Sequence, residues 1–290
     1  ARLYSFLGPA NALATYHSRP IAGGVAFDAV GMRLAESVLK HHKGLTHAFV
    51  LHGVTGIDAC ARDPHGTARV NVASARAVID DLMAYGIMPI FASSDAVFDG
   101  SSGMRTEEDA PHPILTYGRH KVEVEEYLKS TGSSYTIARL SKVISADPET
   151  RSLLADWIER LESGSPIRCA HDQIMSPAYI DDVVTALVGL ARNNLAGIFN
   201  VCGPQPITRL EFLQTLVREI QHFRQIRPEI TLCSIRDFSF AEAWPLDTSM
   251  SPAKLYRALG LKFADMKTVC RRVAMQRYGS STRSEALSSH

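Results

Sequence analysis

The sequence predicts an α/β fold, a doubly wound parallel sheet with a smaller C-terminal α/β lobe. Apolar runs of strand length alternate with helical patterns between residues 12 and 139, which implies parallel strands joined by right-handed crossovers. The apolar run 87–91 leads into the hydroxyls of Ser93 and Ser94, at the sheet edge where open α/β proteins bind ligands. After Arg139 the alternation loosens, which predicts the second lobe.

Each element of the predicted sheet has a local signal. Residues 1–9 predict a short amphipathic helix that Gly8 and Pro9 stop. Short apolar runs bounded by polar, glycine or proline residues predict strands at 12–16, 23–27, 46–52, 87–91 and 134–139. Apolar residues spaced along one helical face predict helices at 32–39, 67–85 and 113–130.

The C-terminal half has more widely spaced signals. They predict helices at 153–162, 179–192, 210–222 and 252–259, and strands at 167–170, 197–201 and 230–233. The apolar run that begins at Val183 lies between Asp182 and Arg192 and is too short to span a bilayer, so it predicts a buried helix. The end of the chain is polar and small, and we expect residues 271–290 to form a disordered tail.

Composition narrows the class of protein. The 290 residues are 46% hydrophobic and 21% charged, which is ordinary for a soluble globular protein. A net charge of +1 argues against a nucleic-acid surface. The five cysteines are odd in number and scattered, and we expect reduced thiols in a cytoplasmic protein. No HExxH or paired CxxC motif occurs, so we expect no metal.

Tyr117 and Lys121 are the first candidate site. They are four residues apart in a helical pattern, so both side chains project from one face. A neighbouring ammonium lowers the pKa of a phenol toward neutral pH, which predicts a general acid/base pair. The same spacing occurs on exposed helix faces, and the hydroxyl of Ser94 at a strand end is what favours catalysis here.

Four motifs resemble the extended short-chain dehydrogenase/reductase family, and within it the dTDP-4-dehydrorhamnose reductase-like branch. The family's STDYVFDG corresponds to SSDAVFDG at 93–100, and its EDDPPNPLNVYGRTK to EDAPHPILTYGRHK at 108–121. Residues 172–179 correspond to DQxGSPTY, and residues 244–260 to RPxxSxLDxxKLxxxLG. The resemblance implies a Rossmann-like sheet and an NAD(P)-dependent oxidoreductase.

The resemblance also implies roles for single residues in catalysis. Tyr117 would protonate the substrate carbonyl oxygen, while Lys121 would hold the nicotinamide ribose and lower the pKa of the phenol. Ser94 would hydrogen-bond the same carbonyl. Asn71 corresponds to an asparagine that supports the active-site hydrogen-bond network; the alternative is a polar residue that only turns a helix corner.

The implied cofactor is NADP(H). His17, Ser18 and Arg19 follow the strand after which NAD-preferring relatives carry an acidic residue for the ribose 2′-hydroxyl. A cation and a hydroxyl suit a 2′-phosphate instead, although Arg19 could equally be a solvated loop residue. Asp28 corresponds to the family's adenine contact, and an aspartate that caps the next helix would look the same.

Residues on the substrate side are expected around the strand end and in the second lobe. The candidates are Ser94, Asp95, Lys142, Asp172, Gln173 and Tyr179. Lys142 stands where the family has tryptophan, and Ala96 and Trp244 replace a tyrosine and an arginine of the family motifs. These differences leave the reaction type unchanged and leave the substrate open. The last three candidates could also serve only to support their loop.

The family pattern divides the chain into two parts. Residues 1–143 and 176–203 are expected to form the NADP-binding domain, and residues 144–175 and 204–270 the substrate lobe. The family's first strand and its GxxGxxG turn, whose amides bind pyrophosphate, have no counterpart here. We expect a truncated sequence rather than a lost pyrophosphate site.

Two functions from different classes are consistent with the sequence. The first is NADPH-dependent reduction of a carbonyl on a nucleotide-activated deoxysugar or a related small ketone, which Ser94, Tyr117 and Lys121 favour. The second is a non-catalytic regulatory subunit like that of methionine adenosyltransferase, which the missing glycine-rich turn favours. Epimerase or dehydratase activity is a third option. Asp95 does not distinguish it from the reductase. We expect a small-molecule substrate and no nucleic-acid or membrane partner; the sequence leaves the oligomeric state open, with a homodimer as one option.

Overall fold

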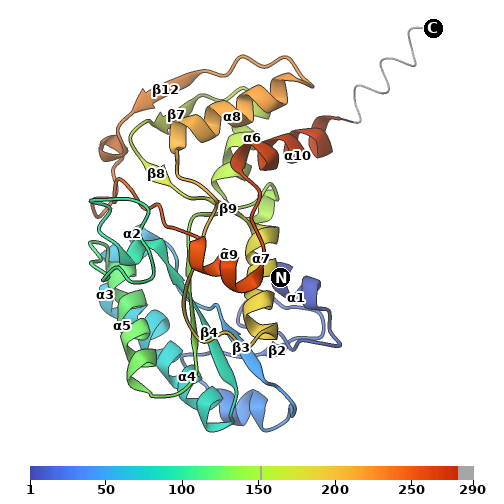
Figure 1. Cartoon of the computed structure of the whole chain (residues 1–290), viewed down its shortest axis with the longest axis vertical. Helices are drawn as coiled ribbons and strands as arrows, with labels where there is room; N and C mark the ends of the chain where they lie inside the picture. Colours follow the sequence, from blue (N-terminus) through green and yellow to red (C-terminus); the bar gives the residue numbers. More distant parts are fainter. Residues whose placement is uncertain (151, 280–290) are drawn as a thin grey trace, which may run out of the picture.

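Four parallel strands form the central sheet in the order β10-β5-β4-β3. Their bounds are His47–Val50 for β3, Met88–Ser94 for β4, Thr136–Leu140 for β5 and Gly197–Val201 for β10. The computed structural model describes residues 1–150 and 152–279, and Figure 1 shows this sheet in the half of the molecule opposite the C-terminal lobe. The predicted α/β class with a parallel sheet is confirmed.

Both faces of the sheet are buried, because successive strand residues point to opposite sides. Phe91 and Ile137 pack beneath α4 (Ser74–Ala84) and α5 (Thr116–Ser130). Their neighbours Ile90 and Ala138 pack instead beneath α7 (Ile180–Arg192) and α9 (Ala253–Leu259). Figure 1 shows these two pairs of helices on opposite sides of the strands. The helix predicted around Val183 is therefore a buried covering helix, as expected.

Two short strands form a parallel pair of their own. β1 (Thr15–Tyr16) pairs with β2 (Val25–Ala26), and both are shorter than the predicted runs. No strand within the described part of the chain joins this pair to the central sheet. The predicted helix at 32–39 is a π-helical turn, η1 (Ala35–Leu39).

The helix predicted at 67–85 is the last part of a longer helical stretch. The whole stretch consists of α3 (Pro64–Ala68), a π-helical turn η2 (Arg69–Ala73) and α4. The short helix α2 (Ile57–Arg62) precedes this stretch. Residue Asp63 caps α3 by accepting the amide of Gly66 at 2.9 Å. The first helix, α1 (Arg2–Leu7), ends at Gly8 as predicted.

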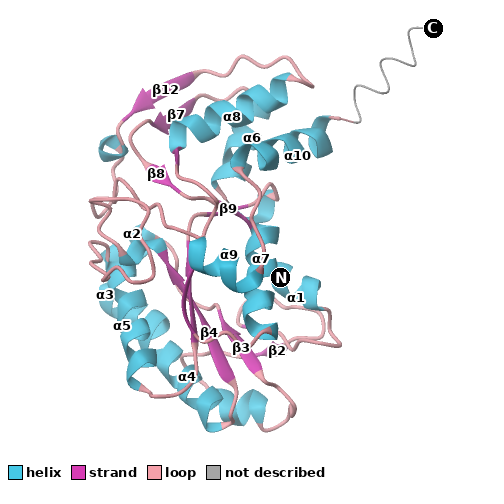
Figure 2. Ribbon diagram, in the orientation of Figure 1, coloured by secondary structure: helices cyan, strands magenta, loops and turns pink. Residues whose placement is uncertain are grey.

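The C-terminal lobe packs helices on short strands (Figure 2). Its elements are α6 (Leu153–Ser163), β7 (Ile167–Ala170), β8 (Ile174–Met175), β11 (Ile207–Thr208), α8 (Arg209–Gln221), β12 (Ile230–Cys233) and α10 (Met266–Tyr278). At the centre of its core Trp157 meets Phe212 edge-on, with ring centroids 5.1 Å apart. The strands β6 (Val143–Ile144) and β9 (Ala178–Tyr179) pair between this lobe and α7.

The prediction of a disordered tail from residue 271 is wrong for its first part. Helix α10 continues to Tyr278, because Val273 and Ala274 are buried in the core of the C-terminal lobe. The remainder of the predicted tail, 280–290, lies outside the described residues.

Two observations concern the surroundings of the chain. No helix in the described ranges is long and apolar enough to cross a membrane. All five cysteines are free thiols and are buried.

Candidate active site

The catalytic candidates meet where β4 ends and α5 begins. Ser94 is the last residue of β4 and caps the short helix η3 (Asp95–Val97), while Tyr117 and Lys121 lie in the first two turns of α5. Gly118 permits this arrangement, since a β-carbon there would lie 2.0 Å from the carbonyl oxygen of Ala96. The glycine within the tyrosine–lysine motif thus lets α5 dock against the strand end.

Lys121 is held in place by the strand beneath it. Its Nζ donates a hydrogen bond of 2.7 Å to the carbonyl oxygen of Ala92, and it lies 4.6 Å from the ring centroid of Phe91. The ring centroid of Tyr117 is 5.6 Å from the same Nζ. Burial lowers the pKa of Lys121 to about 8, with the nearby charge of Glu125 acting in the opposite direction.

The pKa of Tyr117 differs from the expectation. Burial raises the pKa of the phenol, the charges of Asp95 and Cys60 raise it further, and a hydrogen bond with Ser94 opposes the rise. The prediction that Lys121 lowers the pKa of Tyr117 is therefore wrong for the chain alone. Removing the phenolate from water raises this pKa by more than the ammonium lowers it. The phenol stays protonated at neutral pH, which suits a proton donor.

The serine and its neighbours form a polar group beside Tyr117. The Oγ of Ser94 donates to Asp95 Oδ1 at 2.9 Å and accepts from the amide of Ala96 at 3.1 Å. Burial raises the pKa of Asp95, while Ser94 and the charge of Lys142 lower it. The side chain of Lys142 is exposed to solvent. The protein around it still removes enough water from the ammonium to lower its pKa. A cavity of about 400 Å³ lies beside Lys142 and is lined also by Ser152, Asp156 and Glu159, among others.

Asn71 connects two parts of the site. Its Oδ1 accepts the amide of Val54 at 2.7 Å, and its Nδ2 donates to the carbonyl of Val54 at 3.0 Å. The same Nδ2 lies 3.4 Å from Nδ1 of His120, the residue before Lys121. Asn71 is only 3% exposed, so it fixes the loop after β3 against α5.

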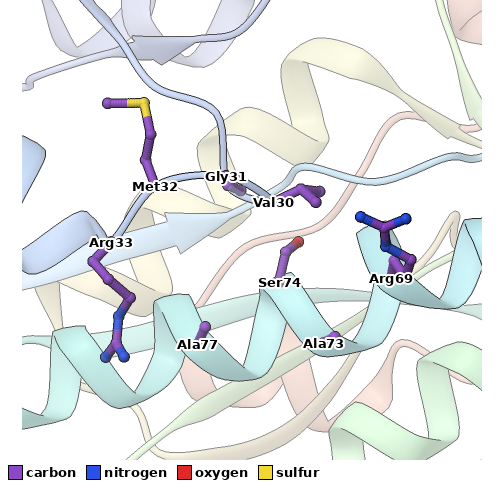
Figure 3. A pocket seen from close by; sticks show the side chains of 9 residues that line it. Val30, Gly31, Met32, Arg33, Arg69, Ala73, Ser74 and Ala77 are labelled. Atoms are coloured by element: carbon purple, nitrogen blue, oxygen red, sulfur yellow. The ribbon is translucent and has the colours of Figure 1, made fainter.

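A cavity of about 290 Å³ lies against the part of the helical stretch that carries Asn71, where η2 continues into α4 (Figure 3). Gly31 and Val30 form one wall and the small side chains of Ala73 and Ala77 the other. Two arginines lie at its rim: Arg33 pairs with Asp81, whereas Arg69 makes no ion pair with another described residue.

The predicted cofactor residues lie on the loops after β1 and β2. Asp28 directly precedes the wall of the 290 Å³ cavity, and its Oδ1 accepts the amide of Val30 at 3.0 Å. His17, Ser18 and Arg19 follow β1, and all three are exposed. Their side chains make no hydrogen bond with any residue in 1–150 or 152–279.

The remaining substrate candidates lie in the C-terminal lobe. Asp172 accepts hydrogen bonds from the Oγ of Ser234 and, at 2.8 Å, from the amide of Ile235, so it joins two loops. Gln173 is buried and its Oε1 accepts from Nη1 of Arg209 at 3.3 Å. Tyr179 packs against the lobe core, and burial raises its pKa.

Several residues of the site were not predicted from the sequence. They are His52, on which the charge of Lys121 acts, together with Cys60, His120, Arg209 and Glu242. His120 lies inside the Tyr117–Lys121 motif, and an imidazole between the two candidates was a signal that could have been followed. Cys60 and Glu242 come from distant segments, and no local pattern connects them to α5.

Comparison with known proteins gives relatives of two kinds. The chain is 24% identical over 231 residues to a dTDP-4-dehydrorhamnose reductase of Sinorhizobium fredii, which covers 77% of each chain. It is 25% identical over 195 residues to methionine adenosyltransferase 2 subunit beta of Rattus norvegicus, covering 62% of this chain and 57% of the relative.

A solved structure and a family model complete the comparison. A dTDP-4-dehydrorhamnose reductase of Bacillus anthracis in complex with NADP superposes with a TM-score of 0.80 at 20% identity, covering 95% of this chain and 94% of the other. At this identity the likeness shows the fold. The family model described as "RmlD substrate binding domain" matches residues 25–278. The chain therefore belongs to the RmlD substrate-binding-domain family of extended short-chain dehydrogenases/reductases.

Proposed function

We propose that this protein is an NADPH-dependent carbonyl reductase. The observation that carries the proposal is the assembly of Ser94, Tyr117 and Lys121 at the carboxyl end of β4, from segments that only the fold brings together. Membership of the RmlD family and the named reductase relative support the same chemistry.

The residues present fit NADP(H) at its adenine end and at its nicotinamide end. The cavity between Gly31 and Ala73 has walls of small residues that suit an adenine ring, and Asp28 and Arg69 border it. His17, Ser18 and Arg19 offer a cation and a hydroxyl that would hold the 2′-phosphate. Lys121 would hold the nicotinamide ribose. Bound NADPH supplies a hydride to the carbonyl carbon.

The proton comes from the protein. Ser94 orients the carbonyl by donating a hydrogen bond to its oxygen, and Tyr117 gives its phenolic proton to that oxygen as negative charge develops there. The nearby ammonium of Lys121 stabilises the phenolate that forms. Asn71 keeps α5 and the loop after β3 in place during this exchange.

We further propose a nucleotide-activated deoxysugar, or a related small ketone, as the substrate. The names of the reductase relatives support it, and Lys142 beside its 400 Å³ cavity provides a cation suited to an anionic group. Asp95 lies near enough to Lys142 for its charge to act on the lysine, and Gln173 contacts Arg209, whose charge also acts on Lys142. Asp172 and Tyr179 act through the loops that they hold. In this scheme residues 144–175 and 204–270 form the substrate lobe, and residues 1–143 with 176–203 the NADP-binding domain.

A fluorescence titration with NADPH and with NADH tests the cofactor first. We expect saturable binding with preference for NADPH, followed by NADPH oxidation when dTDP-4-dehydrorhamnose is added. Binding without turnover over a panel of keto-sugars and small ketones would exclude the reductase. Equal affinity for both cofactors would contradict the role of His17, Ser18 and Arg19.

A regulatory subunit is the second candidate function. The similarity to methionine adenosyltransferase 2 subunit beta favours it, although the chain spans only 57% of that relative. Titration of the chain into a methionine adenosyltransferase catalytic subunit, with complex formation followed by size-exclusion chromatography, separates the two functions. A complex together with absence of turnover would favour the regulatory subunit.

A further inference from the structure

Glu242 closes the N-terminus of the catalytic helix from a distant part of the chain. Its carboxylate accepts the amide of Thr116 at 2.9 Å and 3.1 Å, and the hydroxyl of Thr116 at 2.7 Å. Arg119 adds an ion pair at 2.8 Å to the same group. The side chain of Glu242 is 18% exposed, so these contacts are largely shielded from water.

Helix α5 has no cap of its own. The residue before its first turn is Leu115, which has no side-chain acceptor, and the first turn carries no acidic residue. The first amides of a helix have no partner within the helix, and a negative charge there is favourable because of the helix dipole. Glu242 supplies both the acceptor and the charge that the local sequence lacks.

Glu242 belongs to a crossover segment, residues 234–247, that runs from β12 in the C-terminal lobe toward α2 and α5 (Figure 1). The amide of Ala241 donates to Asp58 of α2 at 3.0 Å. The rings of Phe240 and Trp244, on either side of Glu242, stack with centroids 4.5 Å apart. The segment is thereby fixed on both sides of the carboxylate.

We propose that Glu242 is a positioning residue for proton transfer. Tyr117 follows Thr116 directly, so the carboxylate fixes the backbone from which the phenol projects toward Ser94. The C-terminal lobe thus sets the position of a proton donor that belongs to the other part of the molecule. This inference rests on the proposed reductase function and adds to it a residue that no local motif contains.

Loss of the carboxylate has two separable consequences. The first turn of α5 opens more often, because the buried amide and hydroxyl of Thr116 lose their acceptor. Turnover falls because the phenol is held less accurately. Binding of NADPH changes much less, because Lys121 is the one proposed cofactor residue on α5 that this role does not assign to proton transfer, and it is anchored separately on the carbonyl oxygen of Ala92.

The experiment compares Glu242→Ala, Glu242→Gln and a matched control, Asp58→Ala. The control removes the other anchor of the crossover segment and leaves the cap of α5 intact. Amide hydrogen exchange over residues 113–121 is measured for each variant. Turnover is measured with NADPH and dTDP-4-dehydrorhamnose, and the affinity for NADPH by fluorescence.

We expect about 10-fold faster exchange in the first turn of α5 for Glu242→Ala, from the usual effect of losing an N-cap. We expect its kcat to fall about 10- to 100-fold, as small misplacements of reacting groups do. Glu242→Gln keeps one oxygen acceptor and recovers part of both losses. Asp58→Ala leaves exchange and kcat as in the wild type.

The two proposals fail in different ways. Unchanged exchange at α5 in Glu242→Ala overturns the role of Glu242, and so does faster exchange with unchanged kcat. Equal losses in Asp58→Ala also overturn it, since they would assign the effect to general docking of the segment. A wild-type chain that binds NADPH and reduces no ketone overturns the proposed function, while amide exchange still decides the cap.

Discussion

Lys121 is a cation with little contact with water, and its protonation is linked to stability. Its pKa in the folded chain is about 8, below the ordinary value of 10.5. Between these values the unfolded chain holds the proton and the folded chain does not, so stability rises with pH in that window. The shift corresponds to about 3 kcal/mol. By this amount the buried ammonium of Lys121 destabilises the folded chain below pH 8.

We therefore predict a pH-dependent difference between the wild type and Lys121→Met. The free energy of unfolding of the wild type, minus that of the variant, should increase from pH 8 to pH 10, because methionine does not titrate. Urea unfolding at several pH values measures it. A constant difference would mean that the ammonium is not desolvated as the structure indicates.

Tyr117 is predicted to be the proton donor, and Tyr117→Phe removes only its hydroxyl. We expect kcat to fall by about 10²- to 10⁴-fold, the usual contribution of general acid catalysis, while the Kd for NADPH is unchanged. Steady-state kinetics and fluorescence titration measure the two quantities. The control is Tyr127→Phe, which removes the hydroxyl of another tyrosine on the same helix and should leave kcat unchanged.

The residue types of the site could be predicted from sequence, but their protonation could not. Ser94, Tyr117 and Lys121 were found because strand end and helix spacing are local patterns. The pKa of Tyr117 depends on burial and on Asp95 and Cys60, which only the folded chain brings near. The same reason explains why Glu242 was not found.

At the scale of elements, the loop after β3 depends on the helical stretch that follows it. Asn71 holds both the amide and the carbonyl of Val54. Gly53, the residue before Val54, has a φ of 152°, and a β-carbon on Gly53 would lie 2.9 Å from Asn71 Oδ1. The glycine and the asparagine thus form one structural unit.

We predict that Asn71→Ala destabilises the chain by about 1–3 kcal/mol, because the amide and the carbonyl of the half-buried Val54 lose their partners. Activity should fall as well, since the loop and His120 are no longer held together. Thermal unfolding and turnover measure the two effects. Asn193→Ala, which removes an exposed amide at the end of α7 outside both cavities, serves as the comparison, and an equal loss of activity there would contradict a specific role for Asn71.

Long elements could be predicted, as could the four-residue strands β7 and β12, whereas the two-residue strands β6, β8, β9 and β11 could not. The strands of the central sheet and helices α5, α7 and α8 follow apolar patterns of sufficient length. β8 and β11 have two residues each, and their pairing depends on contacts between distant segments. Helix α10 did have a signal, since Met266, Val269, Cys270, Val273 and Ala274 share one face, but the polar residues between them obscured it.

At the scale of the whole molecule, the apolar cores are separate. One core lies beneath α4 and α5 and another beneath α7 and α9, on opposite faces of the sheet. A third is formed entirely by the C-terminal lobe around Trp157 and Phe212. The 290 Å³ cavity is lined partly by α4, so its shape depends on the first of these cores.

Two core substitutions should therefore separate stability from cofactor binding. Ile79→Ala beneath α4 and Leu213→Ala in the C-terminal lobe each remove a fully buried side chain, and each should cost about 2–5 kcal/mol. Only Ile79→Ala should weaken NADPH binding, because the cavity it creates lets α4 shift against the loop of Gly31. Fluorescence titration below the unfolding temperature of both variants measures the affinities. An equal loss of affinity in Leu213→Ala would show that the C-terminal lobe supports the cofactor site through the interface between the two parts, and not only the substrate side.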